Sequence, residues 1–74
     1  MSGISRKTPH PTWQWVMDRA SWATVAEMSR ASDVSDSACR DYVFEGKIPG
    51  LDAAARIAWA AGVKLDELAK RLVI

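Results

Sequence analysis

The chain has 74 residues, of which 49% are hydrophobic and 26% are charged, and its formal net charge is +1 at pH 7. This length suits one compact domain, and the composition is typical of a folded protein rather than a disordered segment. Cys39 is the only cysteine, so no intramolecular disulfide can form, and no apolar run approaches the roughly 20 residues of a membrane-spanning helix. The first residues lack the apolar stretch of a signal peptide, and we therefore expect a cytoplasmic protein.

Residues 1–12 are expected to form a flexible N-terminal arm. Pro9 and Pro11 disfavour helix there, while Arg6 and Lys7 give the arm positive charge. Such an arm can follow a nucleic acid, or it can be a solvated tail with no partner.

Residues 13–74 are expected to form the folded domain, beginning with a helix over 13–20 that Thr12 caps. A second start signal lies at Thr24. The Thr24 hydroxyl can accept a hydrogen bond from the Glu27 amide, while the Glu27 carboxylate reaches back to the helix start. This pair predicts that a second helix begins directly after Thr24.

The second helix is predicted to end near residue 31, because Asp33 tolerates a left-handed backbone better than most residues. Ser35 can then cap a third helix over residues 35–45. Gly46 is a typical C-terminal stop for that helix.

Two further helices are predicted over residues 51–61 and 65–72. The first of them is apolar almost all round, which is typical of a central buried helix, and the second is amphipathic. The fold class is therefore all-α, a compact bundle of about five short helices. The core is expected to rest on Val34, Tyr42, Leu51, Ile57, Trp59, Leu65, Leu68 and Leu72. The four tryptophans are expected to pack rather than to stack on bases: Trp13, Trp15, Trp22 and Trp59.

The third helix has two different faces. Cys39 and Tyr42 point to the inner side, and the outer side carries Ser37, Arg40 and Asp41. Small residues in both helices allow the second and third helices to cross closely. This arrangement would leave the outer face free to enter a DNA major groove, with the N-terminus of the second helix near a phosphate.

The stretch from Thr24 to Leu72 resembles the lambda-repressor-like (Cro/C1, or XRE) helix-turn-helix family. The resemblance is carried by Thr-Val-Ala-Glu-Met-Ser (24–29), Ser-Asp-Val-Ser (32–35), Phe-Glu-Gly-Lys-Ile-Pro (44–49) and Ala-Arg-Ile-Ala-Trp-Ala-Ala-Gly-Val-Lys-Leu-Asp-Glu-Leu-Ala (55–69). It implies a DNA-binding transcriptional regulator or repressor, of a kind often encoded by phages and mobile elements and often dimeric on its operator. The chain departs from the family in having Asp33 where glycine is usual, and in an acidic third helix.

The resemblance and the helix faces together imply a set of DNA-contacting residues. The set is Thr24, Ser35, Asp36, Ser37, Arg40, Asp41, Phe44 and Lys47, with Arg6 and Lys7 in the arm. Double-stranded DNA is thus the expected partner. A homodimer through the C-terminal helix, which ends in Val73 and Ile74, is a further expectation. The alternative is that these two residues pack back on Trp13 or Trp15 within the monomer.

Several of these residues have a second interpretation. Arg40 can read guanine through a bidentate contact, or it can pair with Asp36 one turn earlier. Phe44 can contact a thymine methyl group, or it can pack under the loop at Ile48. Ser37 can bond DNA or only its own helix.

An enzyme is not expected, because one histidine (His10) and one cysteine (Cys39) make neither a metal cluster nor a nucleophile–base pair. Neither a cofactor, a small-molecule ligand nor a membrane partner is expected. The alternative function is a protein-interaction module that uses its acidic helix face on a basic partner, since a fold does not determine a function.

Overall fold

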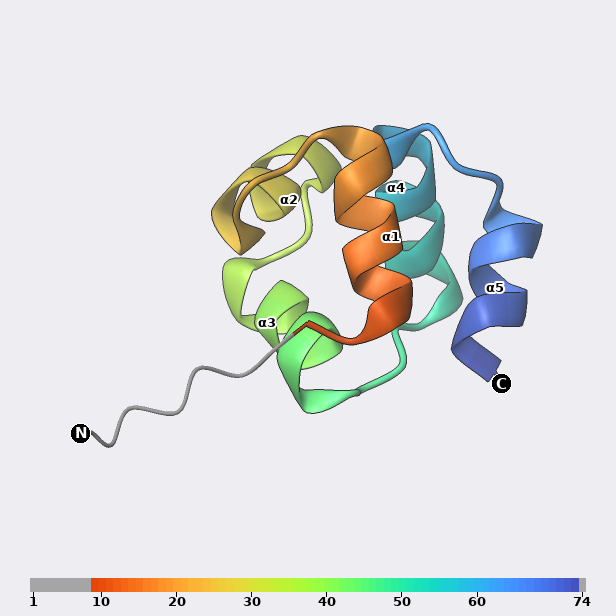
Figure 1. The fold of residues 1–74 in the computed structure, drawn as a ribbon. Helices are drawn as coiled ribbons and strands as arrows, with labels where there is room; N and C mark the ends of the chain where they lie inside the picture. Colours follow the sequence, from red (N-terminus) through yellow and green to blue (C-terminus); the bar gives the residue numbers. More distant parts are fainter. Residues whose placement is uncertain (1–8, 74) are drawn as a thin grey trace.

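The computed structural model describes residues 9–73, and in this part of the chain all regular structure is helical (Figure 1). The five helices are α1 (Pro11–Ala20), α2 (Val25–Ser32), α3 (Asp36–Glu45), α4 (Leu51–Ala61) and α5 (Leu65–Val73). The predicted all-α class and the number of helices are confirmed. None of these helices is long and apolar enough to cross a membrane.

Helix α4 lies at the centre of the arrangement and packs against α1, α2 and α5. In Figure 1, α2 and α3 lie on one side of α1 and α4, and α5 lies on the other. Helix α3 packs mainly on α2, so the side of α3 that faces away from α2 and α1 is left without a helical neighbour.

The core draws side chains from all five helices. Its buried members are Trp13, Val16, Met17, Met28, Cys39, Val43, Ala54, Ile57, Ala58, Ala61, Val63 and Leu68. The ring of Trp13 stacks on Tyr42, with centroids 6.0 Å apart, and the His10 amide donates to the Val43 carbonyl at 3.0 Å. These contacts attach the start of α1 to the end of α3.

Two members of the predicted core are on the surface. Ile57 and Leu68 are fully buried as expected, but Leu51 is 76% exposed and Trp59 is 83% exposed. The other four predicted residues are half-buried at the edge of the core: Val34, Tyr42, Leu65 and Leu72. The prediction for Leu51 and Trp59 was wrong because α4 is covered on one face only, and the neighbouring helices leave its other face open.

The predicted helix starts at α2 and α3 are confirmed. The Glu27 amide donates to Thr24 Oγ1 at 3.2 Å, and Glu27 Oε2 accepts from the Ala23 amide at 3.1 Å. Ser35 Oγ accepts from the Ala38 amide at 3.2 Å. Ser35 is therefore the cap of α3 and lies just outside the helix.

Helix α1 begins at Pro11, two residues earlier than predicted. Its N-cap is His10, whose Nδ1 accepts from the Thr12 amide at 3.2 Å. Proline suits the first helical position because it lacks an amide hydrogen, and an amide hydrogen at this position would have no acceptor within the helix. Thr12 is buried and is not the cap; its hydroxyl donates to the Arg71 carbonyl at 3.2 Å and ties α1 to α5.

Candidate nucleic-acid interface

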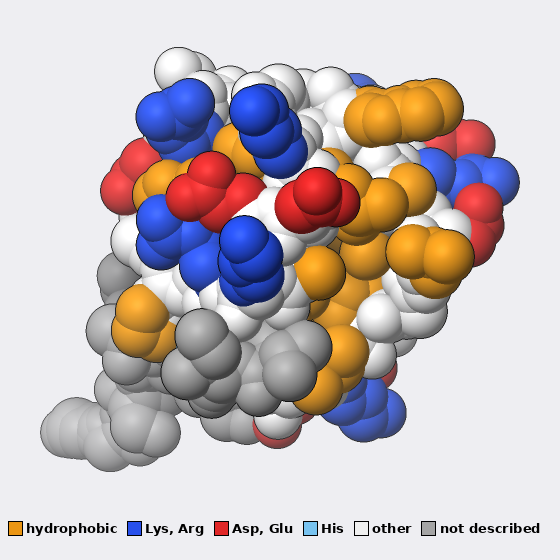
Figure 2. Space-filling view, turned by 90° about the vertical axis from the view of Figure 1, so that its right-hand side faces the viewer, with side chains coloured by type: hydrophobic (Ala, Val, Ile, Leu, Met, Phe, Trp, Pro, Cys, Tyr) orange, Lys and Arg blue, Asp and Glu red, His pale blue; other side chains and the backbone are white. Residues whose placement is uncertain are grey.

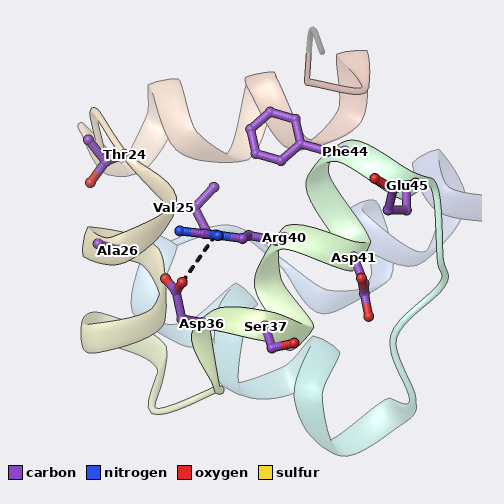
Figure 3. Close-up of a pocket in the computed structure, with 9 residues that line it drawn as sticks. All are labelled: Thr24, Val25, Ala26, Asp36, Ser37, Arg40, Asp41, Phe44 and Glu45. Atoms are coloured by element: carbon purple, nitrogen blue, oxygen red, sulfur yellow. Dashed lines mark ion pairs between the residues drawn. The ribbon is translucent and has the colours of Figure 1, made fainter. Parts of the chain in front are cut away.

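A shallow depression lies between the start of α2 and the outer face of α3 (Figure 3). It is lined by Thr24, Val25, Ala26, Asp36, Ser37, Arg40, Asp41, Phe44 and Glu45. Six of these residues belong to the set predicted from the sequence. The depression therefore brings together side chains from both helices of the pair, across the turn at Asp33–Ser35.

Three lining residues were missed by the sequence reasoning. Val25 and Ala26 follow the Thr24 cap directly, and Glu45 lies one turn after Asp41 on the same helix. The cap position itself was a signal for the first two, because a phosphate at a helix N-terminus contacts the amides of the first turn.

Arg40 occupies the middle of the depression and points toward the start of α3 (Figure 3). Its Nε lies 3.1 Å from Asp36 Oδ2, and the two side chains are 68% and 46% exposed. The pairing alternative of the sequence analysis is thus present in the structure. Exposed pairs at this spacing contribute only about 0.3–0.5 kcal/mol, so Arg40 is held loosely.

Lys47 lies at the other end of α3 and is paired in the same way. Gly46 ends the helix in the left-handed conformation, with φ at 77°, and the Lys47 amide donates to the Asp41 carbonyl at 3.1 Å. This turn places Lys47 Nζ 3.5 Å from Asp41 Oδ2. Both cations of the α3 surface therefore have a carboxylate neighbour in the structure.

Phe44 borders the depression from above and also packs against the edge of the core (Figure 3). Its ring and the Val25 side chain point into the space between α2 and α3. Ile48 is 65% exposed in the following loop. The depression thus combines an apolar rim at Val25 and Phe44 with a charged floor.

The inner face of α3 is anchored as expected. Cys39 is fully buried, and its thiol contacts the Val34 carbonyl at 3.8 Å. Burial raises the pKa of the Cys39 thiol above its ordinary value of 9.0; a hydrogen bond with Ser32 lowers this pKa in part, and the nearby Asp36 carboxylate raises it further. A buried thiol with a raised pKa is a poor nucleophile.

Some predicted residues fall outside the described part of the chain. Arg6 and Lys7 lie before residue 9, and Ile74 follows the last described residue. Within residues 9–73, no group of three or more His, Cys, Asp or Glu side chains is placed to hold a metal ion.

Comparison of the chain with protein-family models, with curated proteins and with solved structures finds no match. The depression between α2 and α3 and the chemistry of its residues are therefore the basis for a functional proposal.

Proposed function

We propose that the chain is a sequence-specific double-stranded DNA-binding protein of the lambda-repressor-like helix-turn-helix class, acting as a cytoplasmic transcriptional regulator. The observation that carries this proposal is the open outer face of α3, which lies beside the N-terminus of α2. In this proposal α2 is the supporting helix and α3 enters the major groove. The family resemblance adds that such regulators are often encoded by phages and mobile elements.

The dimensions of α3 suit a major groove. A ten-residue helix is about 15 Å long and, with its side chains, about 10–12 Å wide, and the major groove of B-DNA is about 12 Å wide. The buried side chains of Cys39 and Val43 hold α3 against the core. A rigidly held helix presents its outer side chains in one orientation, as base reading requires.

The start of α2 suits a phosphate. The Thr24 hydroxyl accepts a hydrogen bond from the Glu27 amide, and the Glu27 carboxylate accepts one from the Ala23 amide. The amides of Val25 and Ala26, in contrast, have no acceptor within the helix. These two residues line the depression. A DNA phosphate at this end would accept from their amides and lie at the positive end of the helix dipole.

Arg40 is the proposed base-reading residue, and Lys47 the proposed phosphate contact. Each must leave its carboxylate neighbour, Asp36 or Asp41, to bind DNA. An exposed ion pair contributes only about 0–1 kcal/mol, so neither pair is a large barrier to binding DNA. For Arg40, a bidentate contact with guanine would discriminate against other bases by about 1–3 kcal/mol.

The test begins with selection of tight-binding sites from a random double-stranded DNA library. The selected and scrambled duplexes are then titrated with Arg40→Ala and Lys47→Ala over a series of salt concentrations. Arg40→Ala should weaken binding to the selected site by about 1–3 kcal/mol and leave binding to the scrambled duplex nearly unchanged. Lys47→Ala should weaken both and reduce the log–log salt slope by about one.

Lys64→Ala provides the matched control, because Lys64 is an exposed cation in the link between α4 and α5, away from the depression. It should leave both affinities unchanged. An equal loss for both duplexes in Arg40→Ala would refute base reading by Arg40, and failure to select any site would refute the proposal as a whole.

A second candidate function is supported by the charge of the same surface. Asp36, Asp41 and Glu45 place three carboxylates around the depression, against the two cations Arg40 and Lys47. With the apolar rim at its edge, this surface also suits a basic amphipathic peptide. Binding of such a peptide by a protein that selects no DNA would favour this interaction module.

A further inference from the structure

Asp41 is a carboxylate on the outer face of α3 that the stability of the helix does not explain. It is the sixth of the ten residues of α3, whereas an acidic side chain gains from the helix dipole only in the first turn. Its side chain is 40% exposed, and its Oδ2 lies 3.5 Å from Lys47 Nζ. An exposed pair of this kind stabilises a protein little. The place of Asp41 in the lining of the depression points instead to a role in binding.

Binding to DNA would change the surroundings of this carboxylate. In the proposed function, α3 enters the major groove and Lys47 leaves Asp41 for a DNA phosphate. Asp41 then stands in the groove without its cation and with less water around it. A charged group that loses its partners in an interface weakens binding unless a new hydrogen-bond donor replaces them. The donor has to come from the edge of a base.

A carboxylate can use few of the base edges in the major groove, because it only accepts hydrogen bonds. Guanine presents the acceptors N7 and O6, and thymine presents the acceptor O4, so both repel it. Adenine presents the N6 amino group, but its acceptor N7 lies beside that group and repels the second carboxylate oxygen. Cytosine presents the N4 amino group without an acceptor of its own in the groove. A carboxylate on α3 therefore favours cytosine.

We propose that Asp41 is a specificity-determining residue, which reads one cytosine of the binding site by accepting a hydrogen bond from its N4 amino group. This role rests on the proposed function of α3. Figure 3 shows Arg40 directed toward the start of α3 and Asp41 directed away from it, so the two side chains read different base pairs. Arg40 carries only donors and suits guanine, whereas Asp41 carries only acceptors and suits cytosine.

Reading of this amino group makes binding sensitive to one modification of the DNA. One N4 hydrogen of cytosine pairs with guanine, and the other faces the major groove. A methyl group on N4 takes the place of the second hydrogen when the base pair is kept. N4-methylcytosine therefore preserves the base pair and removes the donor that Asp41 needs.

The test uses the full chain and the duplex selected from the random library. Each cytosine of that duplex is replaced in turn by N4-methylcytosine, and the duplexes are titrated with the wild type and with Asp41→Ala. At one position the replacement should weaken binding of the wild type about tenfold and leave binding of Asp41→Ala nearly unchanged. Circular dichroism should show that Asp41→Ala is folded, because Asp41 lies outside the core.

A second selection, carried out with Asp41→Asn, gives an independent measurement. Asparagine bonds adenine through N6 and N7 together. The selected sequence should therefore change from cytosine to adenine at the position found with N4-methylcytosine, and the guanine read by Arg40 should remain. A loss of stability alone would lower the affinity for all sites and would not exchange one base for another.

Asp66→Ala is the matched control. Asp66 is an exposed aspartate in the first turn of α5. Figure 2 shows the side of the molecule that carries α5, where acidic and basic side chains are mixed, and Figure 1 shows α3 beyond α1 and α4 from there. Asp66→Ala should keep both the selected sequence and the full effect of N4-methylcytosine.

The outcomes separate the role of Asp41 from the proposed function. A wild-type protein that selects a site, but responds to N4-methylcytosine no more than Asp41→Ala does, overturns the role of Asp41 and leaves the proposed function standing. Selection of the wild-type sequence by Asp41→Asn does the same. Failure of the wild type to select any site refutes the proposed function, and the reading of cytosine with it.

Discussion

Arg40 lies along α3 with its Nε 3.1 Å from Asp36 Oδ2, one turn nearer the start of the helix. This pair determines the resting position of the cation at the centre of the depression. It also places a negative charge in the first turn of α3, where the helix dipole favours it. The same carboxylate that stabilises the helix start would therefore compete for Arg40 with the proposed DNA ligand.

Releasing Arg40 should strengthen DNA binding. Asp36→Asn removes the competing charge but keeps the shape of the side chain, so we expect tighter binding to the selected site and a steeper salt dependence. The cost in stability should be about 0.3–1 kcal/mol, from the lost interaction with the helix dipole. The double variant Asp36→Asn with Arg40→Ala should lose the gain; if it keeps the gain, Asp36 acts by repelling phosphate rather than by holding Arg40.

Equivalent substitutions on the two faces of the bundle should have very different effects on stability. Leu68 is fully buried, and Leu68→Ala should lower the free energy of unfolding by about 2–5 kcal/mol. Leu51 is exposed, and Leu51→Ala should change it by no more than about 0.5 kcal/mol in dilute, monomeric protein. Urea denaturation of both variants measures the difference. Similar losses of the free energy of unfolding in the two variants would contradict the structure, in which the start of α4 leaves Leu51 exposed.

The turn between α2 and α3 should depend on the backbone conformation of Asp33. Its φ is 59°, in the left-handed region that glycine adopts freely and alanine does not. We expect Asp33→Ala to cost about 1–2 kcal/mol of stability and Asp33→Gly to be nearly neutral. A thermal or urea unfolding series of the two variants tests this order, and equal losses would instead assign the effect to the lost contact with Arg56.

The stability of the domain should fall at alkaline pH partly through Cys39. Its pKa is raised in the folded state, chiefly by burial, so the unfolded chain loses the thiol proton first. The contribution of Cys39 is therefore complete below pH 9.0, the ordinary value, and is lost as the pH rises from there toward the raised pKa. The slope should reach at most about 1.4 kcal/mol per pH unit.

The matched variant for this measurement is Cys39→Ala, which is less stable because of the cavity but has no thiol to titrate. Its free energy of unfolding should fall less steeply above pH 9 than that of the wild type. Parallel curves for the two proteins would show that the thiol does not contribute.

Local features of the fold were determined by the sequence itself. The cap at Thr24, the cap at Ser35, the left-handed turn at Asp33 and the stop at Gly46 all depend on atoms within a few residues of each other. Their energies do not require knowledge of the rest of the chain, and for this reason the helix boundaries were predicted closely. The exception is the start of α1, where the Thr12 hydroxyl donates to the Arg71 carbonyl and the His10 amide donates to the Val43 carbonyl, both far along the chain.

Only the tertiary structure decided which face of α4 is covered. The helix is apolar almost all round, so its pattern does not distinguish Ile57, which is buried, from Trp59, which is not. That choice depends on where α1, α2 and α5 cross α4, and these crossings follow from the packing of the whole bundle. The candidate site also depends partly on the sequence and partly on the tertiary structure. The spacing of Ser37, Arg40 and Asp41 is a property of one helix and can be read from the sequence. The depression exists only because α2 folds back beside α3.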